Sequence, residues 1–125
     1  MLKTRSRHFY LLTLTAVVAS FFLAFAMVDV ASAGGKRVKT GKTRFGTILQ
    51  DSKGQTLYLF TKDRSKYSNC YGDCAKAWPP LLTSGKPVAK GKAIQSKLGT
   101  VKRRGGKTQV TYNGHPLYYY AATYG

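Results

Sequence analysis

Two closely spaced cysteines are the residues of this chain best suited to chemistry. Cys70 and Cys74 are its only cysteines, and three residues separate them. In an oxidising compartment such a pair forms a disulfide by default, and closing so short a loop stabilises a fold by about 2 kcal/mol. A redox-active pair is the alternative, because Cys74 lies near a predicted helix start, where a thiolate is stabilised. We therefore predict a structural disulfide and keep a thiol-redox function as the alternative.

Metal binding is a further use of the same pair. Two thiolates need additional ligands to close a tetrahedral site. His115 is the only histidine after residue 33, and it lies far along the chain from both cysteines. No cluster with metal-ligand spacing is visible, so we expect neither a metal site nor a cofactor, and metal handling stays part of the thiol alternative.

Hydrolytic chemistry finds little support in the residue types. After residue 33 the chain holds three Asp, no Glu and one His. Asp51 and Asp63 lie in turns or directly after strands, where an Asp side chain usually bonds its own backbone. No nucleophile with a neighbouring base follows from the spacing, so the sequence favours a protein that is not an enzyme.

The N-terminal segment, 1–33, has the composition of a signal peptide. Basic residues near the start precede an apolar run over residues 9–28, and Ala31-Ser32-Ala33 supplies a small-x-small cleavage pattern. An uncleaved membrane anchor is the alternative, because the apolar run reaches the length of a spanning helix. We expect a secreted or extracytoplasmic cell-envelope protein.

The charge after residue 33 is strongly positive. Eighteen Lys and Arg face three Asp, a net charge of +15. Such a surface attracts membrane headgroups, acidic envelope polymers or nucleic acid, although a self-repelling soluble surface with no dedicated partner is the simpler interpretation. Export argues against nucleic acid, so the expected partner is an anionic envelope polymer or a membrane surface.

The first predicted elements form a hairpin. Residues 34–44 are rich in Lys, Arg, Gly and Thr, which predicts a flexible basic lead-in to a domain over residues 45–125. Within this domain, residues 45–50 and 56–61 have the β-branched and aromatic content of strands, and Gly54 suits the turn between them.

A short helix is predicted over residues 73–78, directly after the first cysteine. Asp73 suits its N-cap, and Pro79 ends it, since the residue before a proline avoids helical backbone. Trp78 is interpreted as a core anchor because of its large apolar area, with ligand stacking as the alternative.

A second group of strands is predicted over residues 98–102, 108–112 and 117–121. Asn113-Gly114, between the last two, is a strong signal for a type I′ hairpin turn. The last strand carries three consecutive tyrosines, Tyr118 to Tyr120. If this strand is an exposed edge, it favours self-association through strand pairing.

One phrase occurs twice along the chain. Residues 54–60 and 114–120 share Gly, Leu, Tyr and a terminal aromatic residue in the same order. The repetition and the strand signals predict a mainly β fold. We expect a small antiparallel sheet of hairpins with one short α-helix and two related half-repeats.

Three motifs resemble those of a known bacterial family. They are Tyr-x-Phe-x-x-Asp, a cysteine pair followed by Trp-Pro-Pro, and Asn-Gly followed by Pro-Leu-Tyr. Their residues are Tyr58, Phe60, Asp63, Cys70, Cys74, Trp78, Pro79, Pro80, Asn113, Gly114, Leu117 and Tyr118. Over most of the chain after residue 33, the sequence resembles the secreted repeat of unknown function, a predicted lipoprotein family. The resemblance implies a secreted or surface repeat and no transferable activity.

The chain departs from this family pattern in three places. Thr123 stands where the second copy of the motif has Asp, and the cysteine that anchors some members to lipid is absent. The family pattern also continues past Tyr120 to a Trp-bearing strand, which suggests that the domain over residues 45–125 is incomplete at its C-terminus.

Together these features predict an exported, non-enzymatic module that binds an anionic envelope component or another protein, or that has a structural role there. The alternative is an extracytoplasmic thiol-redox or metal-handling protein that uses Cys70 and Cys74.

Overall fold

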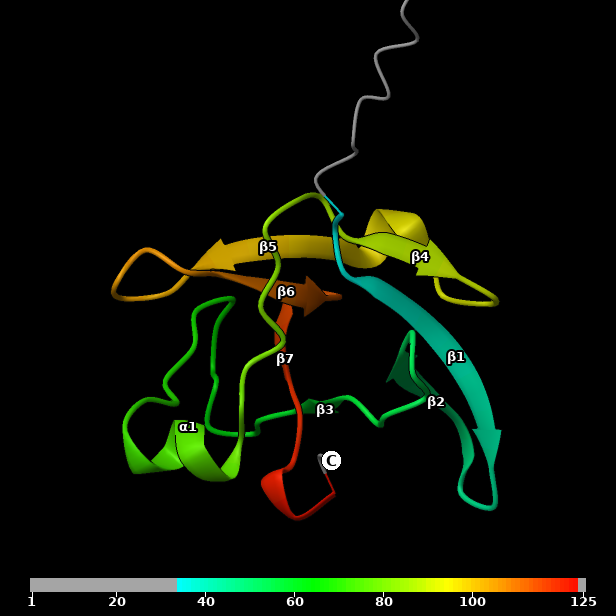
Figure 1. Ribbon diagram of the computed structural model, residues 1–125, viewed down its shortest axis with the longest axis horizontal. Coiled ribbons are helices and arrows are strands. Elements are labelled where there is room, and N and C mark those ends of the chain that lie inside the picture. Colours follow the sequence, from blue (N-terminus) through cyan, green and yellow to red (C-terminus); the bar gives the residue numbers. More distant parts are fainter. Residues whose placement is uncertain (1–33, 124–125) are drawn as a thin grey trace, which may run out of the picture. The chain divides into compact units, whose positions relative to one another are not determined.

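Two small β-sheets and short helices make up residues 34–123, the part of the chain that the computed structural model describes (Figure 1). The predicted signal peptide, residues 1–33, lies outside the described residues. The predicted mainly β fold with one short α-helix is confirmed.

The first sheet contains three strands in the order β2-β1-β4. Strands β1 (Arg37–Thr43) and β2 (Gly46–Asp51) form an antiparallel hairpin, and β4 (Val88–Lys90) pairs with β1 in parallel. The prediction of a flexible lead-in over residues 34–44 is therefore wrong. Pairing on both sides satisfies the backbone of β1, and Val38 is fully buried, so tertiary contacts override the polar composition.

The second sheet contains four antiparallel strands in the order β3-β7-β6-β5. They are β3 (Tyr58–Leu59), β5 (Leu98–Lys102), β6 (Thr108–Tyr112) and β7 (His115–Tyr118). The turn between β6 and β7 has positive φ at Asn113 (50°) and Gly114 (80°), as a type I′ turn requires.

Strand β7 is not an exposed edge. It lies between β6 and β3, and Tyr118 and Tyr119 are buried, whereas Tyr120 is 38% exposed. The condition of an exposed aromatic edge is therefore not met, because the short strand β3 pairs with β7. Self-association through this part of the chain stays a prediction.

The helix α1 (Asp73–Ala77) begins at a different cap from the predicted one. Gly72 is the N-cap residue, with φ of 56° and no side-chain cap. Asp73 instead lies in the first turn, where its negative charge interacts favourably with the helix dipole. It also pairs with Lys76 at 2.8 Å. The helix ends before Pro79, as predicted. Two 3₁₀ turns, Gln95–Lys97 and Ala121–Thr123, complete the helical segments.

The Trp-Pro-Pro motif leads the chain from α1 back to the second sheet. The Tyr119 N–H donates to the Pro79 carbonyl at 2.8 Å. Leu81 then donates its N–H to the Leu117 carbonyl and accepts from the Val110 N–H, each at 2.9 Å. The segment thus joins β7 to β6, and proline suits its start because Pro79 contributes only a carbonyl there.

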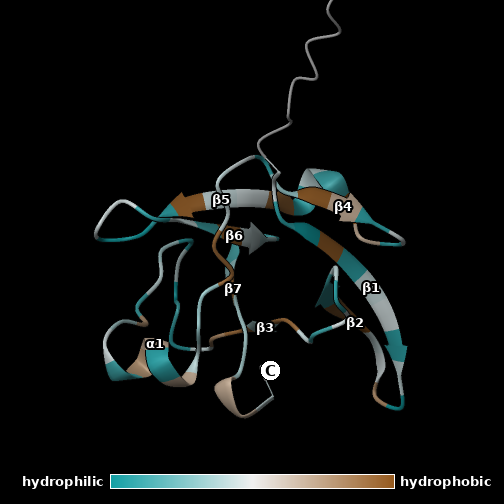
Figure 2. Ribbon diagram, viewed as in Figure 1, coloured by the Kyte–Doolittle hydropathy of each residue, from teal (hydrophilic) through white to brown (hydrophobic). Residues whose placement is uncertain are grey.

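The core lies between the two sheets. Its buried residues come from both sheets and from the segment after Trp-Pro-Pro: Val38, Leu57, Leu81, Val110, Leu117 and Tyr119. In Figure 2 strand β3 lies within a hydrophobic stretch, while the turn between β5 and β6 is hydrophilic or neutral.

The two half-repeats are present in the structure. The first consists of β1, β2 and β3, and the second of β5, β6 and β7, each a hairpin followed by a third strand. Tyr58 of β3 pairs directly with Tyr118 of β7. Because these residues occupy the same place in the repeated phrase, their antiparallel pairing puts a local two-fold axis between the half-repeats.

Candidate functional site

The disulfide joins the loop before α1 to the second residue of the helix. The sulfurs of Cys70 and Cys74 are bonded at 2.11 Å, and their Cα atoms lie 5.2 Å apart. Cys70 is fully buried. The predicted disulfide is confirmed, and it fixes the segment that carries Ser68 and the Cys70 carbonyl.

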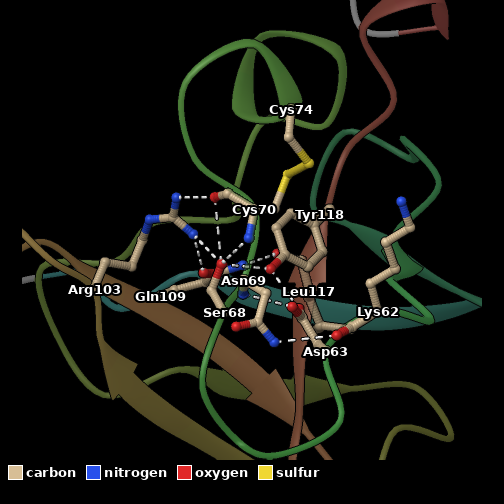
Figure 3. The surroundings of a disulfide bond; sticks show 10 residues. All are labelled: Lys62, Asp63, Ser68, Asn69, Cys70, Cys74, Arg103, Gln109, Leu117 and Tyr118. Atoms are coloured by element: carbon tan, nitrogen blue, oxygen red, sulfur yellow. Dashed lines mark hydrogen bonds between the residues drawn. A yellow bond between two sulfur atoms is a disulfide. The ribbon is translucent and has the colours of Figure 1, made fainter.

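Arg103 reaches into this segment from the end of β5 (Figure 3). Its Nη2 donates to the Cys70 carbonyl at 2.6 Å, and its Nη1 donates to Ser68 Oγ and Gln109 Oε1, both at 2.7 Å. Arg103 is 8% exposed. A buried guanidinium needs such acceptors, because burying an unpaired charge is costly.

Asp63 supplies the opposite charge in the same cluster. It is 5% exposed and accepts from the Asn69 N–H at 2.6 Å and from the Tyr118 hydroxyl at 2.5 Å. The Tyr118 oxygen lies 2.7 Å from Ser68 Oγ, so Ser68 links the carboxylate side of the cluster to Arg103. The two buried charges are therefore bridged by hydroxyl groups.

Tyr118 stays protonated in this environment. Burial, and then its hydrogen bond to Asp63, raise its pKa from the ordinary value near 10 to about 12. At neutral pH it is a neutral hydrogen-bond donor to the Asp63 carboxylate.

The cluster is suited to holding the fold together. Its members are Asp63, Ser68, Cys70, Arg103, Gln109 and Tyr118, all buried. Each polar side chain in it has a hydrogen-bond partner, and Gln109 Nε2 also donates to the Leu117 carbonyl at 2.8 Å. Among residues 34–123 no group of three His, Cys, Asp or Glu side chains is placed to hold a metal ion.

The two turn aspartates differ in what they bond. Asp51 accepts from the Lys53 and Gln55 N–H groups at 2.9 Å, as predicted for an Asp in a turn. Asp63 instead accepts from the Asn69 amide, six residues away. Both carboxylates also accept from a tyrosine of the other half-repeat, Asp51 from Tyr119 and Asp63 from Tyr118. The prediction that Asp63 bonds the backbone of its own turn is wrong, because the loop to Asn69 folds back over the carboxylate.

The aromatic residues of the family motifs gather around Trp78. Ring centroids of Tyr58, Phe60 and Tyr120 lie 5.6, 6.3 and 4.7 Å from the Trp78 ring. Phe60 also packs against Tyr118 at 6.0 Å. The half-buried indole thus joins aromatic residues from both copies of the repeated phrase.

The other motif residues have backbone roles. Asn113 and Gly114 form the β6–β7 turn, Leu117 is in the core, and the two prolines start the segment that joins β7 to β6. Sequence reasoning missed Arg103, which directly follows the predicted strand over residues 98–102. No spacing links Arg103 to Ser68, because 35 residues separate the two.

The fold and the buried cluster define a small, disulfide-linked repeat domain of mainly β structure. A family described as a secreted repeat of unknown function matches residues 39–82 and 99–122. The chain belongs to this family of secreted proteins, and the two matched segments begin at the same spacing as the two copies of the repeated phrase. No curated protein and no solved structure matches the chain. None of the helices within residues 34–123 has the length and apolar content needed to cross a membrane.

Proposed function

We propose that this secreted protein is a non-enzymatic module that binds an anionic component of the cell envelope. The observation that carries the proposal is the imbalance of exposed charge. Sixteen of the eighteen Lys and Arg residues between 34 and 123 are exposed. Of the three Asp, Asp51 and Asp63 are buried, and Asp73 pairs with Lys76.

The exposed charge of residues 34–123 is almost entirely positive. The pair of Asp73 and Lys76 is the one ion pair among the described residues, so the exposed cations have almost no opposing charge nearby. A positive surface of this kind speeds encounter with polyanions and holds them through many weak contacts. Binding of this type weakens with salt, because salt screens exposed charges.

A salt series on the exported protein tests the proposal. We expect binding to vesicles with anionic lipids or to immobilised polyphosphate at about 50 mM salt, and a loss of at least tenfold at about 500 mM. Vesicles of zwitterionic lipid are the matched control and should not bind. Absent binding at low salt, or binding that salt does not change, contradicts the proposal.

The alternative of thiol exchange or metal handling by Cys70 and Cys74 has its own test. A structural disulfide should survive mild reductant in the native protein and open after unfolding. Ready reduction of the native protein, or metal retained through purification, would favour the alternative.

A further inference from the structure

Three hollows follow one another along β5 and the turn after it. The first, of about 400 Å³, lies between Tyr67, Tyr71 and Arg104. It shares Lys102 with a second hollow of about 480 Å³. The second shares Ser84 and Thr108 with a third of about 390 Å³. The hollows adjoin one another because neighbours share lining residues, and we call the three together the groove.

The groove is lined by cations and hydroxyl groups, without a carboxylate. Its cations are Lys36, Lys86, Lys102, Arg104 and Lys107, all exposed. Thr100 and Thr108 add hydroxyl groups, and Lys102 donates to Thr108 Oγ1 at 2.8 Å, whereas Thr83 donates its hydroxyl to the Gly85 carbonyl at 2.7 Å. Ammonium, guanidinium and hydroxyl groups are the donors that bind phosphate and other oxyanions.

Tyr71 lies at one end of the groove, where two arginines create a positive potential. The guanidinium carbons of Arg103 and Arg104 lie 4.4 and 3.9 Å from the centre of its ring. A hydrogen bond from the Arg104 N–H lowers the pKa of the Tyr71 hydroxyl, and the two guanidinium charges add to this effect. An anionic group is therefore stabilised at this end.

The groove is long enough for several charged groups. Leu98, Thr100 and Lys102 alternate along β5 and line the groove on one face, and Arg104 lies in the turn that follows. The four residue steps from Leu98 to Lys102 in extended chain span about 13 Å, and the hollow at Arg104 lengthens the groove beyond the strand. A single small anion would occupy a fraction of this length, and a flat lipid surface would not enter the hollows.

We infer that the groove along β5 binds one chain of a linear polyanion, with Lys36, Lys86, Lys102, Arg104 and Lys107 contacting successive anionic groups. The inference rests on the proposed function and names its site and ligand class. The cations of the first sheet then contribute only long-range attraction.

Long-chain inorganic polyphosphate is the probe for a test with two variants of equal charge. The groove variant carries Gln in place of Lys36, Lys86, Arg104 and Lys107. The control variant carries Gln in place of Lys42, Lys53, Lys90 and Lys92, which are exposed and outside the groove. Both lose four charges, so they differ only in where the charges were.

The groove variant should bind about 100-fold more weakly at physiological salt, and its slope of log affinity against log salt should fall by about 3, at about 0.7 for each lost contact. The control variant should lose less than about fivefold and keep its slope. Equal losses in the two variants overturn the groove while the proposed function stands. No binding by the unmodified protein overturns both.

Competition identifies the ligand class. Tripolyphosphate at equal phosphate concentration should compete at least tenfold less well than the long chain, and equal competition overturns the need for a linear polymer. Anionic vesicles that bind without displacing polyphosphate, and equally well with both variants, would assign the groove no role in lipid binding. Vesicles that bind while polyphosphate does not would overturn the polymer in favour of a lipid surface. If the fourfold groove variant is unfolded by circular dichroism, the Lys36→Gln, Lys86→Gln pair should give half the change in slope.

Discussion

The two half-repeats end in the same turn but with different side chains. After β3 the Asp63 N–H donates to the Phe60 carbonyl at 2.9 Å, and after β7 the Thr123 N–H donates to the Tyr120 carbonyl at 3.0 Å. Both turns lie at the same place in the repeat. Only the first carries a carboxylate, and that carboxylate is buried.

The side-chain hydrogen bonds between the half-repeats have their donors in the second half. Asp63 and Asp51 of the first accept from Tyr118 and Tyr119 of the second, at 2.5 and 3.0 Å. Tyr118 is fully buried, whereas its pairing partner Tyr58 is half-buried. The backbone is thus repeated, while donors and acceptors are divided between the halves, and the second half supplies the buried tyrosines.

Removing the Asp63 carboxylate should have the largest effect on this division. Asp63→Ala removes the acceptor of the Asn69 N–H and the charged acceptor of the Tyr118 hydroxyl, which keeps only Ser68 Oγ, and it leaves Arg103 without a compensating charge in the cluster. We expect a loss of about 3 kcal/mol in the free energy of unfolding, measured in urea. Asp73→Ala, which removes an exposed carboxylate, is the control and should change stability little. A similar, small effect from both variants would mean that the buried cluster does not join the halves.

Alkaline pH should weaken the fold through Tyr118. Its pKa in the folded state is about 12, while a tyrosine in an unfolded chain ionises near pH 10. Between these values the unfolded state has lost the proton that the folded state still holds. Stability is therefore full below pH 10 and falls by roughly 1 kcal/mol for each pH unit up to about 12.

Two phenylalanine variants separate this contribution from other alkaline effects. Urea unfolding between pH 9 and 12 should show a shallower loss for Tyr118→Phe than for the unmodified protein. Tyr58→Phe, at the equivalent place in the first half-repeat, should keep the full slope. Equal slopes for the two variants would mean that ionisation of Tyr118 does not cause the loss of stability at alkaline pH.

Opening the disulfide should have a somewhat smaller effect. It orders the loop of the first family segment that presents Ser68 and the Cys70 carbonyl to Arg103 of the second. Replacing Cys70 and Cys74 with Ala should cost about 2 kcal/mol, the value for a short closed loop. Chemical reduction of the unmodified protein after unfolding should lower its refolded stability by the same amount, and a much larger loss in the variant would point to damaged packing.

Restoring the carboxylate of the second copy should give the smallest change, a gain. Thr123 is exposed, and the local two-fold axis relates its position to that of Asp63 and the position of Tyr118 to that of Tyr58. Thr123→Asp should therefore bring an acceptor to the Tyr58 hydroxyl and add about 0.5 kcal/mol, seen as a small rise in Tm. The gain should vanish when Tyr58→Phe is added. A gain that persists would come from net charge and not from Tyr58.

Local patterns predicted the β6–β7 turn, the end of α1 and the disulfide. A type I′ turn needs positive φ at two successive residues. Asn and Gly tolerate positive φ, so Asn113-Gly114 by itself predicts the position of the β6–β7 turn. Pro79 ends α1 for an equally local reason. The Cys70–Cys74 bond also follows from spacing and compartment.

Local patterns did not predict strand β1 or the buried cluster. The Lys-rich segment that forms β1 is ordered by β2 on one side and by β4, which comes much later in the chain, on the other. In the sequence, Arg103 is indistinguishable from an exposed cation of a turn. Its acceptors, Ser68, Gln109 and the Cys70 carbonyl, surround it only in the folded structure. Both depend on contacts between distant residues, which no short window of sequence contains.

The repeat shows the same division most clearly. The sequence by itself determined that two copies of one phrase exist, that the second lacks the aspartate and that the chain after residue 33 is strongly cationic. Only the tertiary structure decided that Tyr58 and Tyr118 face each other and that Asp63 bonds Tyr118 across the pair. The reason is that a repeat fixes which residues are equivalent, while burial and strand pairing choose which of them meet.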